Sequence, residues 1–449
     1  MSDIPAGFPL DQWFDLQAQL NKLTDRRISL TREYEKLTIE HQIAVPSIPV
    51  GSAVSSPPER KLLEAAEEGA IVVVNVSALR CDAIIAQSSG LDSLQLKNLS
   101  YEDARSHAIR YLDCLVGAQK ALDDFLNARE GAKMGDWAAA RQFIDASNQL
   151  QLARQIQERI LDETLCWLWE AITKPVLCRL NLLDASVDNK AAQRVWWCPT
   201  GPLTILPLHA ASAGSGPSQE SLLDHVVSSY TPTIGALLSA RKTVEREPTA
   251  ENTDKFLLVS LPATPGEQSL PHTVAEADSI LSRLSSDQVT VHQQEDATQE
   301  HVIGDLSTHR WVHFGCHADQ DLMDPSKGAL TLYDGKLSIL DLGQLRLNGD
   351  FAFLSACKTA TGGVTLTEEA MTLAAAMYYT GFRRVIATLW SVQDAVAAEI
   401  AELVYDDLIE GNEFNPSSSA IALHRAVAKV RSDHPGRPTL WSPFVHIGL

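Results

Sequence analysis

The chain has 449 residues, more than one ordinary hydrophobic core accommodates, so two or three packed units are expected. Its 37 Lys and Arg against 57 Asp and Glu give a net charge of −20. This charge argues against a nucleic acid or an anionic membrane as the main partner. It is compatible with basic substrates, although simple solubility is the commoner explanation of such a charge.

The N-terminal residues lack a basic stretch followed by an apolar core, so no signal peptide is expected. No window approaches eighteen uninterrupted apolar residues, so no membrane span is expected either. The seven cysteines are scattered and form no CxxC pair. They are therefore interpreted as reduced thiols, and the predicted location is cytoplasmic.

Near the N-terminus, apolar residues recur at alternating three- and four-residue steps, which predicts a long amphipathic helix over about residues 8–42. Its stripe can pack on its own domain, the commoner use, or dock a partner. Residues 45–60 hold four prolines and several serines and are interpreted as a linker.

Beyond the linker, the pattern predicts strands and helices that alternate in the second half of the chain. Strands are expected at 70–78, 82–87, 194–198, 255–260, 311–316, 351–355 and 383–390, and helices at 101–129, 136–176, 274–284, 367–380, 395–409 and 418–431. Alternation of this kind is typical of an α/β fold with a mostly parallel sheet and helices on both faces.

Two of the expected strands end in reactive residues. His317 follows one strand and Cys357 follows the next, within the segment FAFLSACKTATGG. Because sites in open α/β sheets lie at the carboxyl ends of strands, these two residues can form a thiolate–imidazolium dyad. Gly362 and Gly363 allow a tight loop beside the thiol. The alternative, a buried cysteine that only fills space, stays open on the residues alone.

The segments HFGCHA, LSACKTATGG and GFRRVIATLWSVQD resemble the CHAT family of cysteine peptidases, which is related to caspases and separase. The resemblance extends over about residues 68–449 and is strongest to CHAT proteins of filamentous fungi. It implies a caspase-like fold in three parts: an N-terminal helix and linker at 1–67, a non-catalytic half with a helical insert at 68–250, and a catalytic half at 251–449.

The same resemblance assigns roles to individual residues. Cys357 would be the nucleophile and His317 the general base and acid, while the backbone N–H groups of Ala318 and Cys357 would form the oxyanion hole. Asp394 would bind an Arg or Lys of the substrate, although it could instead cap the helix expected at 395–409. Ala318 stands where the family usually has Gly, which would cost about 1 kcal/mol if the site needs a positive φ.

Other polar and aromatic residues near the expected strands are interpreted as structural. His313 lies within a strand and is expected to be packed or hydrogen-bonded. His209, Trp196 and Trp197 are expected in the core or at an interface. Cys316 beside His317 lacks the spacing of zinc ligands, so no metal is expected, and no cofactor is expected.

The predicted function is therefore a regulated cysteine endopeptidase that cleaves after a basic residue. Its expected partners are a polypeptide substrate and a regulatory protein that binds the N-terminal helix. Because no 20–50-residue repeat occurs, the sensor array common in the family is not expected in this chain. Two alternatives remain: a catalytically latent CHAT scaffold that acts by binding proteins, and a transpeptidase or cyclase with the same acyl-enzyme chemistry.

Overall fold

A computed structural model describes residues 63–132, 137–183, 193–214, 219–243, 253–319, 327–345, 347–355 and 372–449. The expected N-terminal helix at 8–42 and the linker at 45–60 lie outside these residues. No helix within the described ranges is both long and apolar enough to cross a bilayer.

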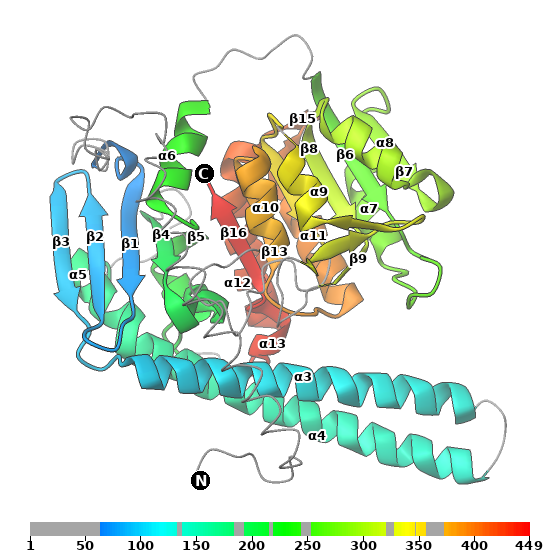
Figure 1. Ribbon diagram of the computed structural model, residues 1–449, viewed down its shortest axis with the longest axis horizontal. Helices are drawn as coiled ribbons and strands as arrows, with labels where there is room; N and C mark the ends of the chain where they lie inside the picture. The colour runs from blue at the N-terminus through cyan, green and yellow to red at the C-terminus, as the bar shows by residue number, and fades with distance from the viewer. Residues whose placement is uncertain are drawn as a thin grey trace, which may run out of the picture. The chain divides into compact units, whose positions relative to one another are not determined.

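One large sheet organises the described part of the chain (Figure 1). Its strand order is β3-β2-β1-β4-β5-β16-β13-β12-β8-β6-β7. These strands are β1 (Gly69–Asn75), β2 (Asp82–Gln87), β3 (Gly90–Gln95), β4 (Gln193–Pro199), β5 (Val226–Tyr230), β6 (Thr253–Ser260), β7 (Val289–Gln293), β8 (His309–Gly315), β12 (Phe351–Leu354), β13 (Arg384–Thr388) and β16 (Phe444–Gly448).

Most neighbouring strands in this sheet run parallel, as predicted. The pairings β1–β2, β2–β3 and β13–β16 are antiparallel. A smaller sheet contains β9 (His317–Asp319), β10 (Ala329–Thr331) and β11 (Lys336–Ser338), and a third pairs β14 (Ile409–Glu410) with β15 (Glu413–Phe414). The fold is thus mixed α/β with a large, mostly parallel sheet.

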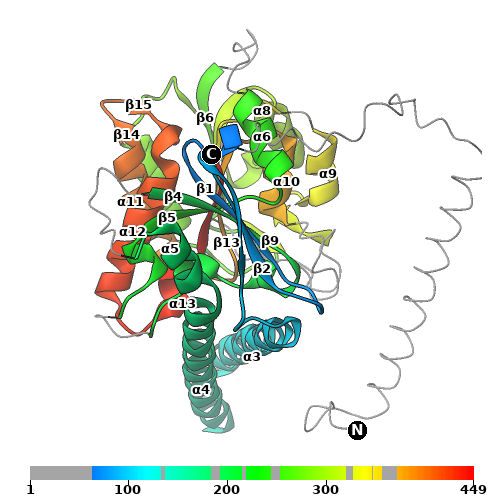
Figure 2. The ribbon, with the colours of Figure 1, turned by 90° about the vertical axis from the view of Figure 1, so that its left-hand side faces the viewer.

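Helices cover both faces of the large sheet, as Figure 2 shows for α11 and α12 on one face and α9 and α10 on the other. The shorter helices are α5 (Lys174–Leu180), α6 (Ile234–Thr243), α7 (Thr273–Leu281), α8 (Gln299–Leu306), α9 (Ile339–Gln344), α10 (Leu373–Thr380), α11 (Asp394–Leu408), α12 (Ser419–Asp433) and α13 (Pro438–Trp441). Because both faces are covered, the central strand β12 is apolar along its whole length, and each of its residues is buried.

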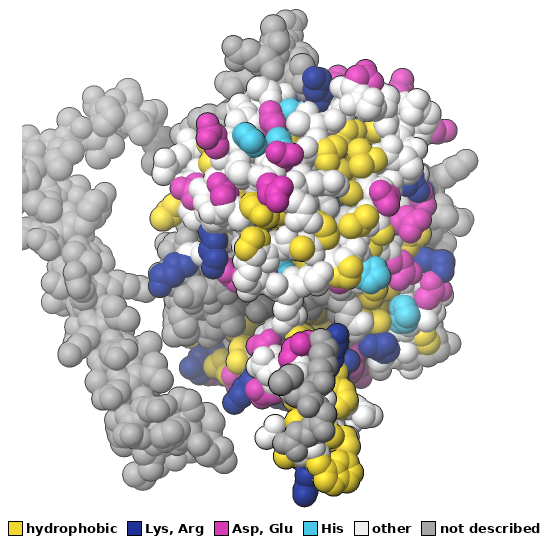
Figure 3. Space-filling view, turned by 90° about the vertical axis from the view of Figure 1, so that its right-hand side faces the viewer, with side chains coloured by type: hydrophobic (Ala, Val, Ile, Leu, Met, Phe, Trp, Pro, Cys, Tyr) yellow, Lys and Arg dark blue, Asp and Glu magenta, His cyan; other side chains and the backbone are white. Residues whose placement is uncertain are grey.

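Two long helices, α3 (Tyr101–Ala132) and α4 (Trp137–Leu168), form an antiparallel hairpin below the carboxyl ends of the parallel strands (Figure 1). A π-helical turn at Trp169–Thr173 joins α4 to α5. The far end of the hairpin projects from the body and carries exposed hydrophobic side chains (Figure 3), among them Trp137 and Ile144.

The last strand, β16, joins the two sides of the large sheet. It pairs antiparallel with β13 and parallel with β5. The indole Nε1 of Trp196 on β4 donates a hydrogen bond of 2.7 Å to the carbonyl oxygen of Gly448, and the Arg194 guanidinium stacks over the same indole. Trp196 and Trp197 are fully buried core residues, as expected. The division into halves at residue 250 stays a prediction.

The predicted strands and helices that fall within the described residues are present, with ends shifted by a few residues. Of the helix predicted at 367–380, α10 is the described part, and residues 367–371 lie outside the described ranges. Four strands of the large sheet had no prediction: β3, β5, β7 and β16. The edge strand β3 has a polar, half-exposed sequence, GLDSLQ, which carries little apolar signal. The remaining three have the sequences VVSSY, VTVHQ and FVHIG, in which polar residues interrupt a short apolar stretch.

Candidate active site

His317 is the first residue of β9, and its side chain is half-buried. It follows Cys316 directly, and Cys316 follows the last residue of β8. Its Nε2 atom lies 2.6 Å from the backbone carbonyl oxygen of Gln268. A carbonyl only accepts, so Nε2 carries the hydrogen of this bond. In the neutral ring Nδ1 is then the basic nitrogen, and the bond fixes both the tautomer and the ring orientation.

Ala318 follows within β9 and pairs with Leu330 of β10. The non-glycine residues with positive φ in the described ranges are Asn181, Gln294 and Asn412. Ala318 is described and is not among them, so its backbone carries no left-handed strain. The departure from the family glycine at this position therefore has no conformational cost in this structure.

Cys357, Gly362 and Gly363 lie outside the described residues. The structure does describe Ser355, which follows β12 and precedes Cys357 by two positions. β12 and β8 are adjacent and parallel, with Leu354 opposite Phe314. Ser355 and Cys316 therefore follow neighbouring strands at the carboxyl edge of the sheet, where the site is expected.

Asp394 is the first residue of α11, and Gln393 occupies the N-cap position. The Asp394 carboxylate accepts a 2.8 Å hydrogen bond from the backbone N–H of His272. The alternative expectation that Asp394 caps its own helix is therefore wrong, because the side chain bonds a distant loop instead. Its negative charge in the first turn of α11 remains favourable to the helix dipole.

The loop between β6 and α7, residues 261–272, contacts two of the three predicted site residues that the structure describes, His317 and Asp394. Gln268 bonds His317 and His272 bonds Asp394. Gly266 lies in the same loop with φ +83°, a conformation that side chains other than glycine rarely adopt. From the sequence, residues 261–266 are only a loop that contains Pro and Gly. The contacts of this loop with His317 and Asp394 could not be predicted without the tertiary structure.

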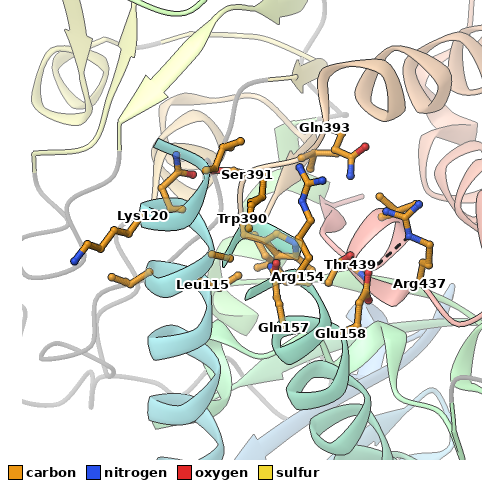
Figure 4. Close-up of a pocket in the computed structure, with 18 of the residues that line it drawn as sticks. Leu115, Lys120, Arg154, Gln157, Glu158, Trp390, Ser391, Gln393, Arg437 and Thr439 are labelled. Carbon is orange, nitrogen blue, oxygen red and sulfur yellow. Dashed lines mark hydrogen bonds and ion pairs between the residues drawn. The ribbon is translucent and has the colours of Figure 1, made fainter. Parts of the chain in front are cut away.

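A pocket of about 430 Å³ lies between the α3–α4 hairpin and the segment that precedes Asp394 (Figure 4). Gln393 and Trp390 contribute from that segment, and the ring of Trp390 contacts Tyr111 of α3 edge-on at 5.4 Å. The walls are mainly apolar, with charged groups that include Arg154 and Glu158. Burial raises the pKa of the Glu158 carboxyl.

Residues outside this region behave as structural groups. His313 is fully buried and hydrogen-bonded, as expected. His209 is also buried beside Tyr230, and burial lowers its pKa to about 4. Burial raises the pKa of the Cys198 thiol to about 11. Within the described ranges, no group of three or more His, Cys, Asp and Glu side chains is suited to hold a metal ion.

Solved structures match this chain at low sequence identity. The Saccharomyces cerevisiae separase–securin complex at 3.0 Å matches with a TM-score of 0.54 and 11% identity, covering 87% of this chain. A second structure of that complex, at 2.6 Å, matches with a TM-score of 0.54 and 10% identity. This chain spans 30% and 31% of the respective separase chains. The gingipain RgpB of Porphyromonas gingivalis, with its pro-domain, matches with a TM-score of 0.38 and 12% identity over 66% of this chain and 70% of its own.

No curated protein matches the sequence. The chain shares its fold with the matching part of separase, whereas the resemblance to proteins of filamentous fungi stays a prediction. Residues 162–449, more than half of the chain, match the CHAT domain family. The chain therefore belongs to the CHAT domain family.

Proposed function

We propose that this protein is a cysteine endopeptidase that forms an acyl-enzyme at Cys357 and cleaves after a basic residue. The observation that carries the proposal is the hydrogen bond from His317 Nε2 to the Gln268 carbonyl. It leaves Nδ1 as the acceptor on a histidine that follows β8, next to the strand that leads to Cys357. This is the orientation by a third group that an activated nucleophile requires.

In the proposed reaction, His317 Nδ1 takes the proton of the Cys357 thiol, and the thiolate attacks the scissile carbonyl carbon. Backbone N–H groups of Ala318 and Cys357 donate to the resulting oxyanion. The imidazolium returns its proton to the leaving amine as the C–N bond breaks, which leaves a thioester. His317 then deprotonates a water molecule that hydrolyses the thioester and restores the thiol.

Asp394 is the proposed recognition group for the basic side chain. One of its oxygens, Oδ2, binds His272 N–H, and this contact holds the carboxylate in place. A guanidinium or ammonium group would form a charge-assisted bond with the other oxygen. The pocket of about 430 Å³ is lined by Gln393, the residue directly before Asp394, and its walls are mainly apolar. It would bind the substrate residues next to the basic one.

The test is the pH dependence of alkylation at each cysteine, resolved by mass spectrometry, in wild type and His317→Ala. We expect Cys357 to titrate below the ordinary thiol value of about 8.5 and to return to it when His317 is lost. Exposed Cys178 is the reference. Cys114, whose pKa burial raises to about 12, should react very slowly.

A matched control is His301→Ala, because His301 is an exposed histidine whose ring nitrogen also bonds a backbone carbonyl, that of Asp296. This variant should leave Cys357 unchanged. If Cys357 titrates like Cys178 in the wild type, the dyad is not assembled and the peptidase proposal fails for the isolated chain.

The second candidate is a CHAT scaffold that acts by protein binding. It is favoured by the separase neighbour, which was solved in complex with securin, and by the exposed apolar residues of the α3–α4 hairpin. Cys357→Ala separates the two candidates, since it abolishes peptide cleavage by the enzyme and leaves a scaffold's binding intact. A peptidase and a transpeptidase are distinguished by whether added amine is incorporated into the product.

A further inference from the structure

One buried carboxylate connects the two strands that lead to the proposed dyad. Glu276 of α7 is 1% exposed. Its Oε2 atom lies 2.8 Å from Nε2 of His313, and its Oε1 atom accepts a 2.8 Å hydrogen bond from the Ser355 hydroxyl. His313 belongs to β8 and Ser355 follows β12, so each oxygen of Glu276 contacts a different strand end.

The network continues to α11 through a fourth residue. Nδ1 of His313 lies 2.9 Å from the Tyr405 hydroxyl, and both groups are fully buried. Burial is the main cause that raises the pKa of Tyr405 well above its usual value, so the hydroxyl keeps its proton. With Nε2–H of His313 donating to Glu276 and Tyr405 donating to Nδ1, each of these atoms has a partner. A satisfied buried network of this kind holds its members in one geometry.

The position of this network relates it to the site. His313 precedes His317 by four residues, and Ser355 precedes Cys357 by two. Gly315, at the end of β8, lies beside this network: a Cβ added there would be in ordinary contact with Glu276 Oε2, at 3.5 Å, and closer to Thr273 Cβ, at 3.3 Å. A buried charged network is rarely the most stable filling of a core, since apolar residues of similar size often stabilise as well or better. A role beyond stability is therefore worth testing.

We propose that Glu276 is a positioning residue, which holds the ends of β8 and β12 at a fixed separation and thereby sets the approach of His317 to Cys357. The expected effect on Cys357 reactivity rests on the proposed peptidase function. The hydrogen bonds from Glu276 to His313 and Ser355 do not depend on that function. Small errors in the placement of reacting groups lower rates strongly, so the connection is expected to act on reactivity more than on substrate binding.

The most selective variant is Ser355→Ala, because it removes one hydroxyl at the end of β12 and leaves the Glu276–His313 pair intact. Ser355→Thr restores the hydroxyl. Ser419→Ala is the control, since Ser419 is a fully buried serine that bonds a buried histidine, His446, at 3.0 Å, away from the two strand ends, whereas Ser355 is half-buried and bonds Glu276. Glu276→Gln keeps the shape of the side chain and removes its charge.

Two measurements read out each variant: backbone amide exchange at residues 315–319 and 354–358, and the pH profile of Cys357 alkylation. In Ser355→Ala we expect roughly tenfold faster exchange at both strand ends and roughly tenfold slower alkylation with a raised apparent pKa. Glu276→Gln should act in the same direction. Ser355→Thr should recover both values, and Ser419→Ala should change neither, even if it lowers thermal stability.

The inference is overturned if Ser355→Ala matches Ser419→Ala in both measurements, or if Ser355→Thr fails to recover them. The proposed function fails separately. If Cys357 is unreactive in the wild type while exchange at both strand ends depends on Ser355, the connection stands without the peptidase. If Cys357 is reactive in the wild type and insensitive to Ser355, the peptidase stands and the positioning role does not.

Discussion

The Nε2 atom of His317 lies 2.6 Å from the carbonyl oxygen of Gln268, although 49 positions separate the two residues. The same loop holds Asp394 through the backbone N–H of His272. The proposed base and the proposed recognition carboxylate therefore depend on one loop between β6 and α7. Changes in that loop are expected to affect catalysis and specificity together.

Gly266 gives a direct test of this loop. Its φ of +83° and the open space around it mean that Gly266→Ala adds backbone strain without a steric clash. We expect a cost of about 1 kcal/mol, borne by the loop, with a lower kcat and a raised apparent pKa of Cys357. Gly411→Ala is the control, because Gly411 has φ +59° and equally open surroundings in another turn. Equal effects of the two variants on Cys357 would contradict the role of the loop.

Asp394→Asn tests the recognition of basic residues. Asparagine can still accept the His272 N–H, so the fold should be unchanged, while the charge that binds Arg or Lys is lost. Breaking a charge-assisted contact should reduce kcat/KM for peptides with a basic residue before the scissile bond by roughly 100-fold, and for neutral peptides far less. Asp407→Asn, on the same helix and paired with Arg425, is the control. An unchanged preference in Asp394→Asn would assign recognition to another group.

Buried histidines should make the fold sensitive to mild acid. Burial lowers the pKa of His209 and of His424 to about 4 in the folded state, against about 6.5 when unfolded. The unfolded chain therefore binds more protons in this window, and stability falls as pH drops from about 6.5 towards 4. The expected slope is at most about 1.4 kcal/mol per pH unit for each histidine.

The slope is checked by urea unfolding at several pH values. His209→Asn keeps a polar side chain that can accept from Tyr230 and does not titrate. On unfolding, this variant should take up about one proton fewer than the wild type over the same pH window. The slope of its free energy of unfolding against pH should therefore be smaller. An unaltered slope in this variant would show that His209 is already protonated in the folded chain or does not titrate with unfolding.

Much of the fold could be predicted from local sequence, because apolar runs such as FAFL must be buried from both sides and because Pro, Gly and polar residues separate them. The same signal placed His317 after β8. The edge strand β3 was missed, since its side chains alternate between half-buried and exposed and carry few apolar groups. Local sequence suggested that Asp394 could cap its own helix, but its carboxylate accepts a hydrogen bond from the distant His272 N–H.

The sequence by itself determined which strands carry the candidate residues and, through its resemblance to the CHAT family, which roles they would have. Only the tertiary structure decided what orients them: the Gln268 carbonyl on His317, and Glu276 between His313 and Ser355. A buried strand has a hydrophobic pattern that can be recognised from its consecutive residues alone. A hydrogen bond between residues 49 or 79 positions apart leaves no such pattern, because it depends on how separate loops and strands are brought together in space.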